Sequence, residues 1–107
     1  MSATPTPIPV PDGLRGLEPA AIDALRDLRL TLEGLSVLDE RSTELVRLGA
    51  LVALGAPGES LRAHVGRARA GGVPAEEIWG VLLAVAPLVG VPRLVESVPA
   101  IRAALEA

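Results

Sequence analysis

The chain has 107 residues, a formal net charge of −3 and 50% hydrophobic residues, but only one aromatic residue, Trp79. This length supports one domain. With no cysteine, the sequence excludes a disulfide scaffold, a cysteine-ligated zinc site and thiol chemistry. The slight acidic excess and the lack of stacking aromatic side chains argue against nucleic acid as a partner.

The first thirteen residues form a proline-rich segment. Prolines at positions 5, 7, 9 and 11 favour an extended or polyproline conformation and exclude a helix. The segment lacks the basic and apolar regions of a signal peptide. We expect a flexible tail over residues 1–13, although an arm that wraps a neighbouring subunit through Ile8 and Val10 is the alternative. We expect one all-α domain over residues 14–107 and a cytoplasmic location.

Capping residues predict the first two helices. A helix from about residue 19 to residue 33 is indicated by Pro19 in its first turn, by Gly34 at its end and by apolar residues at helical spacing, namely Ile22, Leu25, Leu28, Leu32 and Leu35. A second helix follows between Asp39, a good N-cap, and Gly55, a good stop. Residues 48–56 of that helix carry no polar side chain, which predicts burial on every side.

Three more helices are predicted in the second half of the chain. The third, residues 59–70, carries the most charge and stops at Gly71. The fourth starts near Pro74, and its uncharged run over residues 78–92 is too short for a membrane span. We therefore expect a central buried helix that is kinked at Pro87. The fifth runs from residue 92 to residue 106, with Pro99 interrupting it.

The sequence thus predicts an all-α fold of about five helices, since no strand alternation appears. An apolar content this high in so small a chain predicts that some apolar surface is buried against another subunit. The apolar runs at residues 48–56 and 78–91 are the expected subunit contacts, so we expect a symmetric homo-oligomer.

Two stretches resemble the carboxymuconolactone decarboxylase family, which includes the AhpD-like alkylhydroperoxidases. They are LDERSTELVRLGALVALGA (residues 38–56) and RAHVGRARAGGVPAEEIWGVLLAVAPLVGVPRL (residues 62–94). The order and spacing of their helices, glycines and Gly-x-Pro-Arg segment carry the resemblance. It implies a small AhpD-like helical protomer that assembles into trimers or hexamers.

The resemblance is to a cysteine-less branch of that family. In the AhpD-like branch a Glu precedes a Cys-x-x-Cys-x-x-x-His motif. Counted from Glu44, the two Cys positions fall on Ala56 and Glu59, and the only histidine, His64, is displaced by one residue. Thiol peroxidase and disulfide reductase activity are therefore excluded, because no other group supplies that redox couple.

The decarboxylase branch keeps a histidine in a His-Val-Arg-like segment, which residues 64–67 approximate with Gly66 where an Arg is usual. Decarboxylation requires groups that hold a carboxylate, stabilise an enolate and deliver a proton to carbon. Glu44 and Arg47 share one helix face, and His64 and Arg67 share another. We expect His64 and Glu44 to be catalytic and Arg47 and Arg67 to bind a small anionic substrate, with no cofactor and no metal.

Plainer interpretations of these residues remain open. Glu44 and Arg47 also suit a solvated ion pair, His64 a packed histidine, and Arg67 a charged helix face. Three functions follow from these alternatives. The chain is a cofactor-independent lyase or isomerase acting on a small anionic lactone or keto acid, a non-catalytic oligomeric binding or scaffold protein, or an assembly domain whose proline-rich tail docks to a partner.

Overall fold

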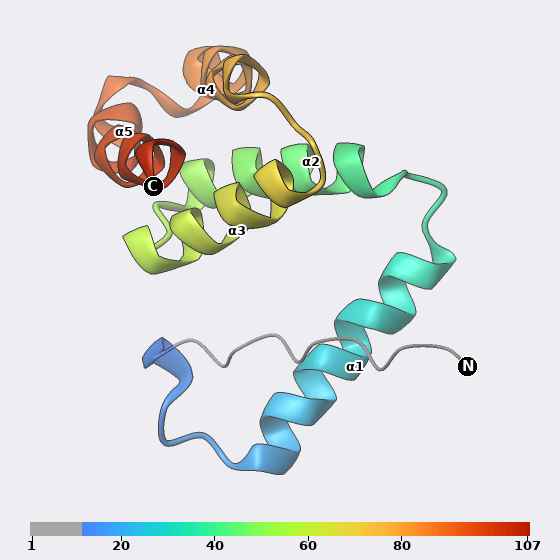
Figure 1. Cartoon of the computed structure of the whole chain (residues 1–107). Coiled ribbons are helices and arrows are strands. Elements are labelled where there is room, and N and C mark those ends of the chain that lie inside the picture. The colour runs from blue at the N-terminus through green and yellow to red at the C-terminus, as the bar shows by residue number, and fades with distance from the viewer. Residues whose placement is uncertain (1–11) are drawn as a thin grey trace. The chain divides into compact units, whose positions relative to one another are not determined.

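The computed structural model describes residues 12–107, and every regular element in that range is helical (Figure 1). A short 3₁₀ turn (Asp12–Leu14) is followed by five helices: α1 (Pro19–Leu35), α2 (Glu40–Leu54), α3 (Gly58–Ala70), α4 (Ala75–Val89) and α5 (Val91–Glu106). This confirms the predicted all-α fold with five helices. The predicted tail over residues 1–13 lies almost wholly outside the described range. None of the helices within residues 12–107 has the length and apolar character needed to cross a membrane.

The chain divides into two compact units, Met1–Val37 and Leu38–Ala107. Helix α1 lies in the first unit and begins, as predicted, with Pro19 in its first turn. None of its residues is buried, and its leucines at positions 25, 28, 32 and 35 are each more than half exposed. The prediction of one domain over residues 14–107 stays a prediction.

Helix α2 opens the second unit and has the two ends that the sequence predicted. The Asp39 carboxylate accepts a hydrogen bond from the Ser42 backbone N–H at 2.6 Å, which caps the helix. The same N–H lowers the pKa of the Asp39 carboxyl below its usual value, because it favours the ionised form. At the other end Gly55 adopts a left-handed conformation with φ of 67°, which only glycine takes without strain.

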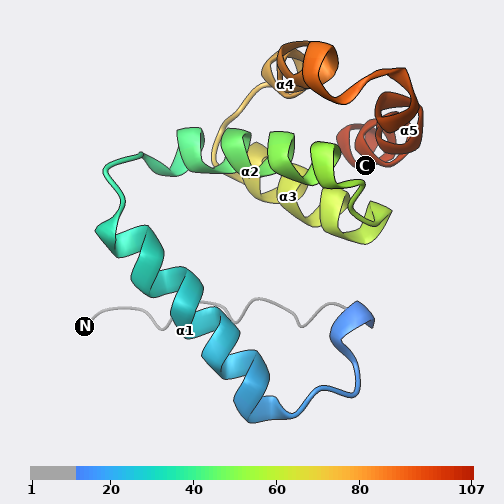
Figure 2. The same cartoon turned by 180° about the vertical axis from the view of Figure 1, so that it is seen from behind.

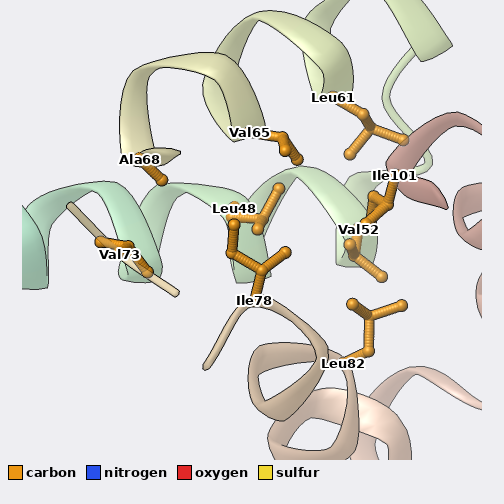
Figure 3. Close-up of a cluster of buried hydrophobic side chains, with 9 residues drawn as sticks. All are labelled: Leu48, Val52, Leu61, Val65, Ala68, Val73, Ile78, Leu82 and Ile101. Atoms are coloured by element: carbon orange, nitrogen blue, oxygen red, sulfur yellow. The ribbon is translucent and has the colours of Figure 1, made fainter. Parts of the chain in front are cut away.

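The hydrophobic core of the second unit is aliphatic and draws on all four of its helices (Figure 3). Helices α2 and α3 lie side by side in both views of the chain (Figures 1 and 2). Helix α4 approaches α2 closely at Gly49, where an added Cβ would lie only 3.2 Å from Val85 Cγ1. The buried hydrophobic side chains are Leu48, Val52, Leu61, Val65, Ala68, Val73, Ile78, Leu82 and Ile101.

The two apolar runs are buried on one side only, so the prediction of burial on every side is wrong for the single chain. In α2, Leu48 and Val52 are buried, but Leu54 is 76% exposed. In α4, Leu83 and Leu88 are exposed, so this helix is not a central one. The physical reason is that each helix of a four-helix unit packs one face against its neighbours.

The last helix begins within one residue of its predicted start, but the prediction that Pro99 interrupts it is wrong. The break falls at Gly90, with φ of 81°, and α5 then continues through Pro99 without interruption. Proline at position 99 cannot donate to the carbonyl of Val95, one turn earlier. Because Val95 and Pro99 both lie on the exposed side of α5, water can satisfy that carbonyl.

Candidate functional site

The candidate site lies at the polar end of the α2–α3 pair, and Glu44 is its centre. Glu44 precedes Leu48 by one helical turn, so both side chains leave α2 toward the same buried face. Its side chain is only 9% exposed. A carboxylate with so little water around it requires polar partners from the protein.

Both oxygens of Glu44 have such partners. His64 Nδ1 lies 3.0 Å from Oε2, and Arg47 Nη1 lies 3.6 Å from Oε1. In this arrangement Nδ1–H donates to the carboxylate, which leaves Nε2 as the acceptor of a neutral ring or as the second donor of a protonated one. The structure therefore brings together three of the four predicted residues, from two helices. The Glu44–Arg47 contact is not the solvated pair of the plainer interpretation, because Glu44 is buried.

A small pocket adjoins this cluster at the end of α3. Of the four predicted site residues, Glu44 and Arg67 line it, whereas His64 and Arg47 do not. The rest of its lining consists of Glu40, Arg41, Ala68, Gly71 and Val73. Glu44 thus connects the imidazole on one side with the arginine-lined pocket on the other.

Arg41 is a pocket residue that the sequence reasoning missed. It comes from the first turn of α2 and forms an ion pair with Glu77 of α4. A sequence signal for it existed, because positions 41, 44 and 47 are spaced three apart and share one side of the helix. Only the pairing of Arg41 with the distant Glu77 required the fold.

This arrangement can hold an anion and move a proton. Guanidinium groups bind carboxylates with paired hydrogen bonds and a permanent charge. A carboxylate–imidazole pair fixes the orientation of the ring and supports proton transfer at its far nitrogen. Within residues 12–107, no three His, Cys, Asp or Glu side chains gather in a group that could hold a metal ion.

Comparison with known proteins gives one family. The model of the carboxymuconolactone decarboxylase family matches residues 19–105, which is most of the chain and all of the candidate site. The searches of curated proteins and of solved structures gave no match.

Proposed function

Because the chain belongs to the carboxymuconolactone decarboxylase family, we propose that it is a cofactor-independent lyase or isomerase acting on a small anionic lactone or keto acid. The observation that carries this proposal is the 3.0 Å contact between His64 Nδ1 and Glu44 Oε2. The absence of cysteine from the sequence leaves thiol peroxidase chemistry out of it.

In the decarboxylation, the bond between the substrate's carboxylate carbon and its neighbouring carbon breaks, and carbon dioxide leaves. The electron pair of that bond passes into an enolate, which then takes a proton at carbon. Protonated His64 supplies this proton through Glu44, which its Nδ1–H contacts and which lines the pocket. In this proposal His64 is the proton source, and Glu44, which lies between the imidazole and the pocket, passes the proton to the substrate carbon.

The pocket supports an enzyme more than a scaffold that has lost its site. A non-catalytic member needs no polar side chains facing a pocket, yet Glu44 and Arg67 both line one. In the proposed reaction Arg67 attracts the substrate's negative charge. Arg47 contacts Glu44 and acts on the substrate through it.

Substitution of His64 tests the proposal. His64→Ala removes the proton source, so the rate of carbon dioxide release from carboxymuconolactone should fall by about 10²- to 10⁴-fold. Arg62→Gln is the matched control, since Arg62 is an exposed residue of the same helix and does not line the pocket. Full turnover in His64→Ala would overturn the role of His64. No turnover of any lactone or keto acid by the parent chain would overturn the assignment in favour of the non-catalytic binding or scaffold protein.

We also propose that the chain forms a homo-oligomer, a trimer or hexamer. Exposed apolar residues of the second unit support this, among them Leu54, Leu83, Leu88, Val91 and Val95, because apolar surface of this kind marks contact sites. Light scattering should give a mass of several chains at micromolar concentration. The mass of a single 107-residue chain would contradict the proposal.

A further inference from the structure

The pocket beside Glu44 is lined by a second arginine that the proposed reaction does not use. Arg41 of α2 and Arg67 of α3 line the pocket together, with the small residues Ala68 and Gly71 beside them. We propose that Arg41 and Arg67 jointly bind the carboxylate of a small organic anion in this pocket. The inference rests on the proposed function and names the residue that selects its substrate.

Arg41 is better placed for this task than Arg47. Arg47 Nη1 lies 3.6 Å from Glu44 Oε1 and does not line the pocket. Its charge helps to balance a carboxylate that is 91% shielded from water. The substrate contact that the sequence suggested for Arg47 therefore passes to Arg41, three positions earlier on the same helix.

The acidic groups near the pocket do not prevent an anion from binding. Glu44 has its two oxygens directed at His64 and Arg47, so its charge is partly balanced. Glu40 is an exposed residue, so water screens its charge.

Glu77 is the carboxylate that the incoming anion replaces. It forms an ion pair with Arg41, and the two side chains are 35% and 50% exposed, respectively. The Glu77 oxygen that faces Arg41, Oε2, is buried, although the side chain as a whole is partly exposed. An incoming carboxylate takes over Arg41 when Glu77 turns out to solvent, and it gains the charge of Arg67 as well. Glu77 acts as a competitor that weak or misplaced anions fail to displace.

Binding of malonate tests this assignment without any turnover. The backbone amide signals of Gly71 and Val73, which line the pocket, are followed by NMR during a malonate titration at constant ionic strength. Arg41→Gln should weaken malonate binding about tenfold, the effect of losing one charge-assisted hydrogen-bonding group. Glu77→Gln should strengthen it about threefold, because the competing charge is gone.

Arg93→Gln is the control, because Arg93 also forms an ion pair, with Glu96 at 3.1 Å, but lies outside the pocket. It should leave malonate affinity unchanged. Equal affinities in the parent and Arg41→Gln overturn the role of Arg41, and weaker binding in Glu77→Gln overturns the competition. Circular dichroism of each variant checks that the helices are intact.

The malonate-binding experiment and the turnover experiment can fail independently of each other. If malonate binding does not depend on Arg41 while lactone turnover depends on His64, the pocket assignment alone fails. If malonate binding follows the pattern above but no lactone or keto acid is turned over, the proposed reaction alone fails.

Discussion

The two ends of the α2–α3 pair differ in what their side chains do. Toward the end of α2 and the start of α3, Val52 and Leu61 are almost completely enclosed and belong to the hydrophobic core. Toward the other end, Glu44 and His64 meet across the same two helices, and a pocket opens beside them. A single helix pair thus provides a dry core at one end and a polar cluster at the other.

This difference shows how a small aliphatic chain can hold a buried carboxylate. Glu44 is one turn from Leu48, so the core that encloses Leu48 also removes water from Glu44. Removing water makes the interaction of Glu44 with His64 and Arg47 stronger than it would be at the surface. The core therefore sets the electrostatic conditions of the site.

The largest expected effect comes from breaking the apolar end. Leu48→Ala should lower the free energy of unfolding by about 2–5 kcal/mol, because Leu48 is fully buried and its removal leaves a cavity. Leu54→Ala, in the same helix but 76% exposed, should change it by less than about 0.5 kcal/mol. Urea unfolding of dilute protein measures the free energy of unfolding of both variants. Equal losses would show that positions 48 and 54 lie in the same kind of environment.

Changing the polar end should cost less stability and should alter His64 instead. Glu44→Gln replaces a charge-assisted hydrogen bond by a neutral one and should lower the free energy of unfolding by about 1–3 kcal/mol. His64 is the only histidine, so its ¹⁵N signals report the tautomer without overlap. The preference for a proton on Nδ1 should weaken in Glu44→Gln and persist in Glu40→Gln. The same change in both variants would contradict the pairing of Glu44 with His64.

Two glycines of the α2–α3 pair sharpen the comparison of its two ends, because their substitution by alanine should change the stability in opposite directions. Gly55→Ala forces a side chain into a left-handed conformation and against the Arg93 guanidinium, and should destabilise the fold by about 1–2 kcal/mol. Gly66→Ala lies inside α3 with nothing within 4 Å of its Cβ, and should stabilise it by about 0.5–1 kcal/mol. Thermal unfolding of the two variants distinguishes these outcomes. A loss of stability in Gly66→Ala would mean that α3 lies closer to its neighbours at this position.

The smallest expected effect is a pH dependence of stability that comes from Asp39, the N-cap of α2. The pKa of Asp39 is lowered in the folded chain by the Ser42 N–H, so the stabilisation from its charge is present above the ordinary value of 3.8 and is lost as the pH falls through the folded pKa. Asp39→Asn keeps a capping oxygen but removes the charge. Its unfolding midpoint should lie below that of the parent at pH 7, and the gap should close in acid. A gap that stays constant with pH would contradict this role of the charge.

Much of the fold could be predicted from local signals. Asp39 and Gly55 fix the two ends of α2 through interactions with residues close in sequence. The prediction failed where the result depends on partners far along the chain. Whether Leu83 is covered, or whether α5 tolerates Pro99, depends on which helix face meets solvent.

The site shows the same division between local and distant signals. Helical spacing placed Glu44 with Arg47, and His64 with Arg67, on common faces before any fold was known. That Glu44 touches His64, and that Arg41 reaches Glu77, depends on how α2 packs against α3 and α4. No periodicity in the sequence contains that information.

The close approach at Gly49 has a consequence for protein engineering. Because a Cβ at this position would lie 3.2 Å from Val85, α2 and α4 form a frame whose spacing leaves little room for larger residues. Gly72 also limits change, because its φ of 87° favours glycine even though a Cβ there would meet no atom within 4 Å. A library intended to retune ligand preference should therefore keep Gly49 and Gly72 constant and diversify the exposed pocket positions Glu40 and Arg41.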